Sequence, residues 1–367
     1  MKIGILTYHC TTNYGATLQA YALLTAIKQQ GWENVEIINY QPYSMLRNFF
    51  IRPIQPINKQ LQINSQIFIN LRKCLNMRKF VLENLPLSRK KFHTKASLKK
   101  HNQNYDLAIC GSDQIWRIDS IKGFDSAFFL DFINDTDCRK ISYAASFSDT
   151  DSLSDHQSLI HQLLKKFDKI LVRDSNSLRL VEKECSLPAV KVVDPTFLIN
   201  YDNLAVLPKL RQEYLLIYNQ QSFTVLEEDF IKNVAKNNNL IIVSVGQINR
   251  IASINVVEAD PKEWLGYFKL ANYIVTNTYH GTIFSIIFKR QFTVILNGNK
   301  SNKTGDLLRD YNLEDRIFLT QLQPQNPEYK LRNIDYSKIE KKVQIAVANS
   351  KKCLFEAIAE NHKSLVE

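Results

Sequence analysis

The fold is decided by residues 2–39, KIGILTYHCTTNYGATLQAYALLTAIKQQGWENVEIIN. An apolar run over 2–8 stops at a polar loop. Residues 14–30 then place Ala, Leu and Ile on one side of a helix, which Gly31 ends. Residues 35–39 predict the next strand. A strand, a helix and a second strand in this order are the opening of a doubly wound α/β domain.

Strand and helix patterns alternate through most of the remaining chain. Expected strands lie at 105–110, 139–145, 170–172, 190–193, 214–218, 240–245, 273–276 and 292–296, and expected helices at 154–167, 174–184, 223–237, 261–270, 282–288 and 336–359. The stretch 299–309 is expected to be a polar, basic loop. We predict an α/β protein with two Rossmann-like domains facing across a cleft, where the strand ends would place a ligand.

The same pattern gives the expected domain boundaries. Residues 1–200 form an N-terminal α/β domain with a basic helical insertion at about 43–104, 201–213 a linker, and 214–335 a C-terminal α/β domain. Residues 336–367 begin with an amphipathic helix that we expect to dock on the domains.

Composition predicts a soluble cytoplasmic protein. The 367 residues are 45% hydrophobic, which supports real cores and excludes long disorder. No run approaches the 18–20 apolar residues that a membrane-spanning helix needs, at about 1.5 Å of rise per residue. The first residues do not resemble a signal peptide, and the six Cys show no metal-binding spacing.

The net charge of +11 lies in one segment. Residues 43–104 contain thirteen Lys and Arg against one acid, Glu83. A basic, amphipathic segment suits an anionic membrane surface, a polyanionic substrate or nucleic acid, and a merely solvated helical insertion is equally favoured. Without a zinc finger, RNP or helix-turn-helix signature, nucleic acid is the least favoured partner and we expect none.

The strongest local signal is YIVTNTYHGTIFS, residues 273–285. It places His280 where a buried strand ends and a helix begins, beside backbone N–H groups that favour anions. Gly281 would let the backbone approach a ligand, and Thr282 and Ser285 could cap or donate. A phosphate or carboxylate would then be held beside a proton donor. The alternative is a capping or packing His.

Two further strand ends carry charged side chains. Asp113 follows the strand 105–110 and could take a proton from a sugar hydroxyl, or be a turn or capping residue. Arg173 follows the strand 170–172 and could clamp a carboxylate or phosphate, or pair with Asp174.

Other polar loops give weaker signals. The loop at 13–15, with Gln19 one turn into the following helix, has one glycine and no dinucleotide motif. Lys300 and Lys303 could reach an anion, although a solvated loop is the more favoured interpretation. Two DxD pairs occur, at 149–151 in a Ser- and Asp-rich loop and at 135–137, where the residues are typical of a turn. A metal-dependent sugar-nucleotide transferase is therefore weakly supported, and we expect no metal site.

The ordered set of short motifs resembles the polysaccharide pyruvyltransferase family. The resembling stretches are NYG at 13–15 before LQA at 18–20, GSDQIW at 111–116, YAASF at 143–147, VRD at 172–174, VDPT at 193–196, NTYHG at 277–281 and DLL at 306–308. The resemblance implies a fold like that of the GT-B glycosyltransferases. It also implies transfer of pyruvate from phosphoenolpyruvate to a sugar of a surface-polysaccharide or exopolysaccharide precursor, as a cyclic ketal, with release of phosphate.

The resemblance also implies roles for residues. Those roles are catalytic for His280 and Asp113, donor-binding for Arg173, Gly281, Thr282, Lys303 and Lys300, and acceptor-binding for Asn13, Tyr14, Gly15, Gln19, Ser112 and Gln114. Relatives often carry an Arg two residues before the His, where this chain has Thr278, so a lysine would have to replace that cation. The scheme needs no metal or cofactor. A lipid-linked oligosaccharide acceptor would suit the basic segment and imply peripheral contact with the inner membrane face.

Two rival functions stay open. A GT-B-type glycosyltransferase using a nucleotide sugar would need nucleotide-binding groups in the second domain, where no acidic ribose clamp is evident. A non-catalytic sugar- or anion-binding protein would keep its biological activity after His280→Ala.

Overall fold

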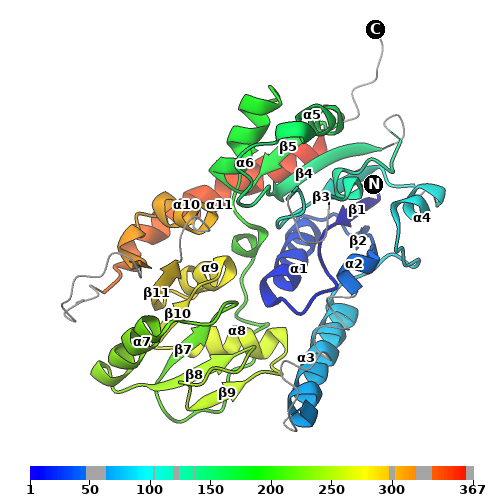
Figure 1. Ribbon diagram of the computed structural model, residues 1–367. Coiled ribbons are helices and arrows are strands. Elements are labelled where there is room, and N and C mark those ends of the chain that lie inside the picture. The colour runs from blue at the N-terminus through cyan, green and yellow to red at the C-terminus, as the bar shows by residue number, and fades with distance from the viewer. Residues whose placement is uncertain are drawn as a thin grey trace. The chain divides into compact units, whose positions relative to one another are not determined.

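The structure is a computed structural model that describes residues 1–46, 63–101, 104–118, 124–134, 138–296, 302–319 and 333–360. The chain divides into two compact units, whose elements Figure 1 labels. Unit 1 comprises Met1–Arg52, Val81–Ile199 and Gln344–Glu367, and unit 2 comprises Pro53–Phe80 and Asn200–Val343.

Unit 1 is built on a parallel sheet. Its strands are β1 (Ile3–Leu6), β2 (Val35–Ile37), β3 (Leu107–Cys110), β4 (Arg139–Ala145), β5 (Lys169–Val172) and β6 (Val190–Lys191). Their order is β2-β1-β3-β4-β5-β6, and every pair is parallel. The strand order therefore reverses between β1 and β3.

Helices cover both faces of this sheet. They include α1 (Tyr14–Gln29), α2 (Tyr43–Leu46), α4 (Lys95–Lys100), α5 (Gln157–Leu164), α6 (Ser175–Arg179) and the later part of α11 (Tyr336–Ala359). Alternate strand residues enter two separate cores, as the two-residue period of a strand requires. Leu354 of α11 is fully buried in one of them, and Arg139 donates hydrogen bonds to the carbonyl oxygens of Ala357 and Ile358 at the end of that helix.

Unit 2 repeats the architecture. Its strands are β7 (Tyr214–Tyr218), β8 (Ile241–Val245), β9 (Ile254–Val256), β10 (Tyr273–Thr276), β11 (Gln291–Leu296) and β12 (Ile317–Leu319), and its helices include α7 (Val225–Asn237), α8 (Pro261–Leu270), α9 (Tyr279–Ile287) and α10 (Asn302–Asp310). The order β12-β11-β10-β7-β8-β9 is again parallel throughout and reverses between β7 and β10. The predicted fold class, α/β with two Rossmann-like domains, is confirmed.

Several boundaries differ from the prediction. The stretch 299–309 was expected to be a loop, but α10 occupies Asn302–Asp310, because buried Leu307 and Leu308 give it an inward face that the polar composition conceals. The short strands β9 and β12 were not predicted. Helix α9 begins at Tyr279, three residues earlier than expected, so His280 lies in its first turn.

The basic segment contains α2, α4 and the long helix α3 (Ile63–Asn84), while its residues 47–62 lie outside the described part of the chain. We expected the whole segment to belong to the first domain, but α3 groups with unit 2 as far as Phe80. Lys73 Nζ donates to the carbonyl oxygen of Gly246 at 2.6 Å, and Asn76 Nδ2 to that of Glu258 at 2.7 Å. Among the described helices, none combines the length and apolar character required to cross a bilayer.

Replacing Gly266 tests the packing of α8. A Cβ at this position would lie 1.8 Å from the carbonyl oxygen of Val206, a backbone atom that cannot rotate away. We expect Gly266→Ala to lower the free energy of unfolding by about 1–3 kcal/mol, measured by urea denaturation. The matched control is Gly305→Ala in α10, where the new Cβ would meet only the flexible end of Arg309, at 3.6 Å. That change should be neutral or stabilise by up to about 1 kcal/mol, and equal effects of the two substitutions would contradict the packing.

Candidate functional site

Each sheet has one position where ligands are expected. In doubly wound sheets, ligands bind outside the carboxyl ends of the strands, where the strand order reverses and the two following loops diverge. In unit 1 this position lies between the loops after β1 and β3, and in unit 2 between those after β7 and β10. We call the first edge 1 (residues 7–13, 111–116, 146–148, 173–174 and 194) and the second edge 2 (residues 219–221 and 277–281).

At edge 1, a buried hydrogen-bond network joins the loops after β1 and β3. Gln19 Nε2 donates to Thr7 Oγ1 at 2.8 Å, and Gln19 Oε1 accepts from the backbone N–H of Ser112 at 3.1 Å. Thr7 Oγ1 in turn donates to the carbonyl oxygen of Ser112 at 3.1 Å. All three residues are buried. The network fixes the loop before Asp113, while acceptor binding by Gln19 and Ser112 stays a prediction.

The other predicted acceptor-binding residues lie at the same edge. The Asn13 side chain accepts a hydrogen bond from the first turn of α1 as its N-cap, and Tyr14 and Gly15 are buried in that turn. Gln114 Oε1 accepts from Ser148 Oγ at 2.7 Å. Asn13 and Gln114 are partly exposed, so they are the members of this set that are most open to a ligand.

Arg173 is enclosed by two carboxylates. Its Nη1 lies 3.1 Å from Asp194 Oδ2 and 3.5 Å from Asp113 Oδ1. The side chains of Arg173 and Asp194 are 0% exposed, whereas that of Asp113 is 10% exposed, so Asp113 is the member of this trio that solvent reaches. Asp194 is itself held by the hydroxyl of Thr196 at 2.8 Å.

The alternative pairing of Arg173 with Asp174 is not the arrangement found. Asp174 Oδ2 accepts from Ser146 Oγ at 2.5 Å, and Asp174 Oδ1 accepts from the backbone N–H of Ser177 at 2.8 Å as the N-cap of α6. Asp174 therefore anchors the loop after β4 to the loop after β5, and it leaves Arg173 to the other two acids.

The backbone is strained at edge 1 and at the adjoining end of β4. Asp113 and Ser148 at the edge, and Ala144 in the strand, have φ values of 80°, 61° and 51°, in the region that residues with a Cβ rarely adopt. Such conformations cost of order 1–3 kcal/mol each and gather at functional sites. Trp116, fully buried against Phe129 with ring centroids 5.2 Å apart, anchors the turn that carries Asp113.

At edge 2, His280 is the second residue of α9. It is 7% exposed, at the point where β10 ends. Thr278 Oγ1 accepts from the backbone N–H of Gly281 at 2.9 Å and so caps the helix. Thr276 Oγ1 lies 2.9 Å from Thr278 Oγ1 and donates to the carbonyl oxygen of Tyr218 in β7 at 2.6 Å. At position 278, where the family resemblance implies an Arg, this chain therefore has a buried helix cap.

Helix–strand packing requires a glycine at 281. A Cβ there would lie 2.2 Å from Thr276 Oγ1 and 2.6 Å from Thr278 Oγ1. Thr282 Oγ1 donates to the Thr278 carbonyl oxygen at 3.0 Å and Ser285 Oγ to that of Gly281 at 2.8 Å. Donor binding by Gly281 and Thr282 stays a prediction.

Sequence reasoning missed Asn219, which follows β7. Thr276 pairs with Tyr218, so Asn219 and Asn277 leave neighbouring strands at the same level. Both side chains donate through Nδ2 to the carbonyl oxygen of Gln221 at 2.9 Å. Asn219 is 4% exposed, and its Oδ1 accepts no hydrogen bond from the residues that the structure describes. The signal was a polar residue directly after an apolar strand, but the sequence does not show that β7 lies beside β10.

The predicted donor-binding lysines are the least defined part of the site. Lys303 lies in the first turn of α10 and is partly exposed, and Lys300 lies outside the described residues. Among the side chains that the structure describes, no group of three or more His, Cys, Asp and Glu could hold a metal ion.

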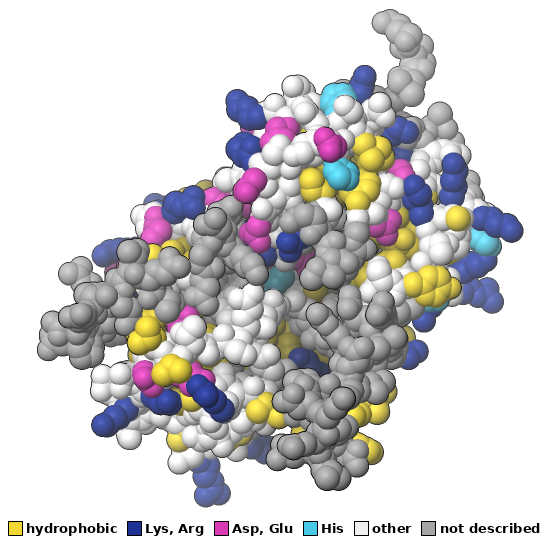
Figure 2. Space-filling model, viewed as in Figure 1, with side chains coloured by type: hydrophobic (Ala, Val, Ile, Leu, Met, Phe, Trp, Pro, Cys, Tyr) yellow, Lys and Arg dark blue, Asp and Glu magenta, His cyan; other side chains and the backbone are white. Residues whose placement is uncertain are grey.

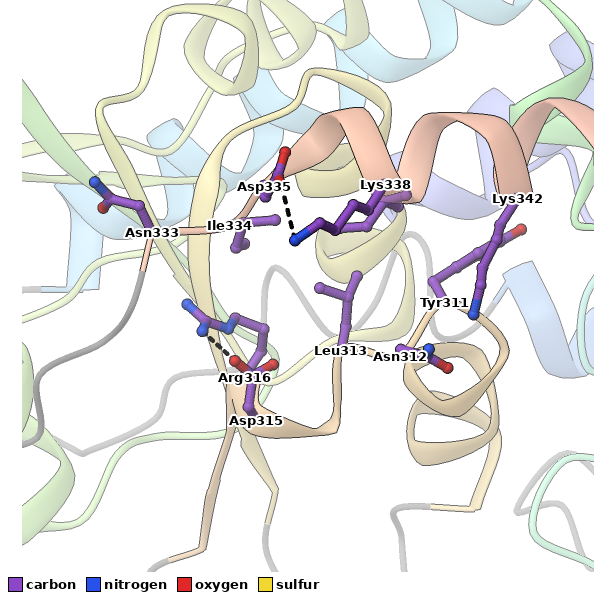
Figure 3. A pocket seen from close by; sticks show the side chains of 11 residues that line it. Tyr311, Asn312, Leu313, Asp315, Arg316, Asn333, Ile334, Asp335, Lys338 and Lys342 are labelled. Carbon is purple, nitrogen blue, oxygen red and sulfur yellow. Dashed lines mark hydrogen bonds and ion pairs between the residues drawn. The ribbon is translucent and has the colours of Figure 1, made fainter.

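A separate cavity of about 260 Å³ opens in unit 2, as Figure 3 shows. It is lined by Tyr311, Asn312, Leu313, Asp315, Arg316, Asn333, Ile334, Asp335, Lys338, Ile339 and Lys342. Lys338 pairs with Asp335 at 3.3 Å, and Arg316 pairs with Asp315. Because Arg316 directly precedes β12, this cavity lies at the amino ends of the parallel strands, away from edge 2.

Comparison with known proteins identifies the family. The sequence matches the family described as polysaccharide pyruvyl transferase over residues 13–299. No curated protein matches the chain. Similar solved structures include Acinetobacter baumannii MurG (10% identity, TM-score 0.48, 98% of this chain and 99% of that one) and the S. aureus MnaA-UDP co-structure (12%, 0.47, 98% and 88%). E. coli ADP-heptose lps heptosyltransferase II is also similar (10%, 0.37, 96% and 100%). Structural similarity at these sequence identities and TM-scores gives no information about the substrate.

His9 makes the stability of edge 1 depend on pH. The buried ring lies with Nδ1 3.1 Å from the Thr7 carbonyl oxygen and Nε2 3.3 Å from Asn39 Oδ1. Burial, helped by the charge of Lys91, holds the pKa of His9 below its usual value of 6.5. Below about pH 6.5 the unfolded chain therefore binds a proton that the folded chain does not. The free energy of unfolding consequently decreases as the pH is lowered.

We expect His9→Gln to flatten this dependence. Between pH 7.5 and 5.5, the wild type should lose up to about 1 kcal/mol more of its free energy of unfolding than the variant does, measured by urea denaturation. Parallel losses in the two proteins would show that His9 is not the group responsible.

Proposed function

Because the chain belongs to the polysaccharide pyruvyl transferase family, we propose that it transfers the pyruvyl group of phosphoenolpyruvate to a sugar as a cyclic ketal. The acceptor is a sugar of a surface-polysaccharide precursor, carried on a lipid-linked oligosaccharide. The protein then works in the cytoplasm, in peripheral contact with the inner membrane face. The family match over residues 13–299 carries this proposal.

The reaction balances without an oxidant or reductant. A proton adds to the methylene carbon of phosphoenolpyruvate and makes it a methyl group, while a first sugar hydroxyl forms a bond to the central carbon. A second hydroxyl of the same sugar then bonds to that carbon, as its bond to the phosphate oxygen breaks. The two hydroxyls release two protons, of which one balances the new methyl group and the other leaves with phosphate. The protein must supply an acid, a base and donors for developing negative charge.

Edge 2 offers the acid. His280 stands in the first turn of α9, where backbone N–H groups and the helix dipole favour an anion. We assign to His280 the protonation of the donor or of the departing phosphate. The buried Asn219 Oδ1 is an acceptor for a substrate hydroxyl at the same edge. With Thr278 occupied as a helix cap, Lys303 or Lys300 has to supply the cation for the donor.

Edge 1 offers the base. Asp113, whose side chain is 10% exposed, is the more accessible of the two carboxylates beside Arg173 and would accept a proton from the acceptor sugar. We give Arg173 a positioning role, because its buried guanidinium lies between Asp113 and Asp194. The donor contact that the family resemblance implies for Arg173 would require the donor to approach beside Asp113.

The central test is inorganic phosphate release from phosphoenolpyruvate in the presence of lipid-linked sugars. We expect release with at least one acceptor, and a loss of about 100-fold or more in kcat for His280→Ala, as removal of a general acid causes. His156→Ala, which changes a partly exposed His outside both edges, is the matched control and should keep full activity. Turnover of a nucleotide sugar instead would favour a glycosyltransferase. Intact biological activity of His280→Ala would favour a sugar-binding protein.

The positioning role of Arg173 predicts a change in pH dependence. Asp194→Asn keeps the side-chain size but removes one of the two charges beside the guanidinium. Arg173 would then stabilise the ionised form of Asp113 more strongly, so the acid limb of the kcat profile should move to lower pH. Asp113→Asn should lower kcat by about 100-fold. An Asp194→Asn enzyme that is merely less stable, with an unshifted profile, would contradict this role.

A further inference from the structure

Helix α3 carries apolar side chains on two sides. On its inner side Cys74, Met77 and Phe80 are buried. Lys73 and Asn76, which bond to backbone carbonyls of unit 2, hold the helix in place. This side accounts for the docking of α3.

The outer side is also apolar, and it faces solvent. Phe68 is 73% exposed, Leu71 41% and Leu75 57%. The spacing of three and four residues puts them on one side of the helix over two turns. Leu82, one heptad further, is 61% exposed and continues the row. We call Phe68, Leu71 and Leu75 the outer row. Single exposed apolar residues are common, but a contiguous row marks a surface that binds something apolar.

Cations flank the outer row. Arg72, Arg78 and Lys79 are exposed and lie within one turn of its members on the same helix. They belong to the segment 43–104, which has thirteen basic residues and one acid. In the rest of the chain basic and acidic residues are nearly equal in number, and Figure 2 shows both kinds interspersed on the face that it presents. The outer row is thus combined with the chain's one strong excess of positive charge.

We propose that the outer row and its cations form a docking surface for an anionic phospholipid bilayer. The Phe and Leu side chains enter the head-group boundary, and Arg72, Arg78 and Lys79 face lipid phosphates. Apolar residues beside Lys and Arg on one helix are the pattern of interfacial helices. This surface deepens the membrane contact in the proposed function and rests on it to that extent, but lipid binding can be measured without catalysis.

Other occupants fit the same residues less well. A second copy docked through this row in a symmetric dimer would bring like cations close together. A nucleic acid would use the cations but give the outer row no apolar partner. A bilayer with anionic head groups uses both features.

The experiment is vesicle co-sedimentation of the full chain. We expect binding to vesicles of phosphatidylcholine mixed with phosphatidylglycerol, weaker binding in high salt, and little binding to phosphatidylcholine alone. Two variants separate the components. The triple change Phe68→Ser, Leu71→Ser and Leu75→Ser removes the apolar row, and Arg72→Gln, Arg78→Gln and Lys79→Gln removes the charges. Each should lower the partition coefficient by at least about tenfold.

Each variant has a matched control on exposed residues of unit 2. The apolar control replaces Val225, Leu226 and Ile248, which are 63%, 56% and 53% exposed, by Ser. The charge control replaces the exposed Lys209, Lys232 and Lys236 by Gln. Both controls should bind vesicles as the wild type does, and thermal melting checks that all four variants are folded.

Several results would overturn the proposal. These are equal binding to neutral and anionic vesicles, unchanged binding of the outer-row variant, or no vesicle binding by the wild type. A dimer in sedimentation that the outer-row variant abolishes would assign the surface to a second copy instead. Phosphate release from phosphoenolpyruvate with a soluble sugar acceptor is measured separately, so a failure of lipid binding is distinguishable from a failure of the proposed activity.

Discussion

The parallel pairing of β10 with β7 is the constraint on which edge 2 depends. Thr276 lies opposite Tyr218 in this register, and its hydroxyl donates to the Tyr218 carbonyl oxygen at 2.6 Å. The same hydroxyl lies 2.9 Å from Thr278 Oγ1, the N-cap of α9. The strand end and the first turn of α9, which carries His280, are therefore linked by consecutive hydrogen bonds through Thr276, Thr278 and the N–H of Gly281. Because Gly281 has no Cβ, the helix can start directly against this strand end.

This arrangement gives Thr278 a structural role that the Arg implied by the family resemblance would not fill. An Arg at this position could offer a charge to a donor, but it has no short side-chain oxygen to accept the hydrogen bond from the N–H of residue 281. The buried Thr278 caps the helix instead, and a cap of this kind contributes about 1 kcal/mol. The donor that we propose for edge 2 would therefore need its cation from another part of the chain, and Lys303 and Lys300 are the candidates.

The sequence predicted where helices and strands occur more accurately than which of them lie side by side. The apolar run at 273–276 followed by His280 and Gly281 was sufficient to place an imidazole at a strand end, since that inference needs only local pattern. The partners of Arg173 could not be predicted, because Asp113 and Asp194 lie 60 and 21 residues away and meet it through the order of the strands. Asn219 was missed for the same reason. The helix at Asn302–Asp310 was missed because it has only two large apolar residues, Leu307 and Leu308, which are adjacent in sequence and show no helical period.

At edge 1 a fully buried charged group is paired with two counter-ions. Arg173 is enclosed by the protein, and a lone buried guanidinium would be strongly unfavourable. The carboxylates of Asp194 and Asp113, at 3.1 and 3.5 Å from Arg173 Nη1, offset this penalty. Asp194 is the completely buried counter-ion of the two, and the hydroxyl of Thr196 holds it in place. The role of base that we propose for Asp113 is compatible with this arrangement, because protonation of Asp113 leaves the ion pair between Arg173 and Asp194 intact.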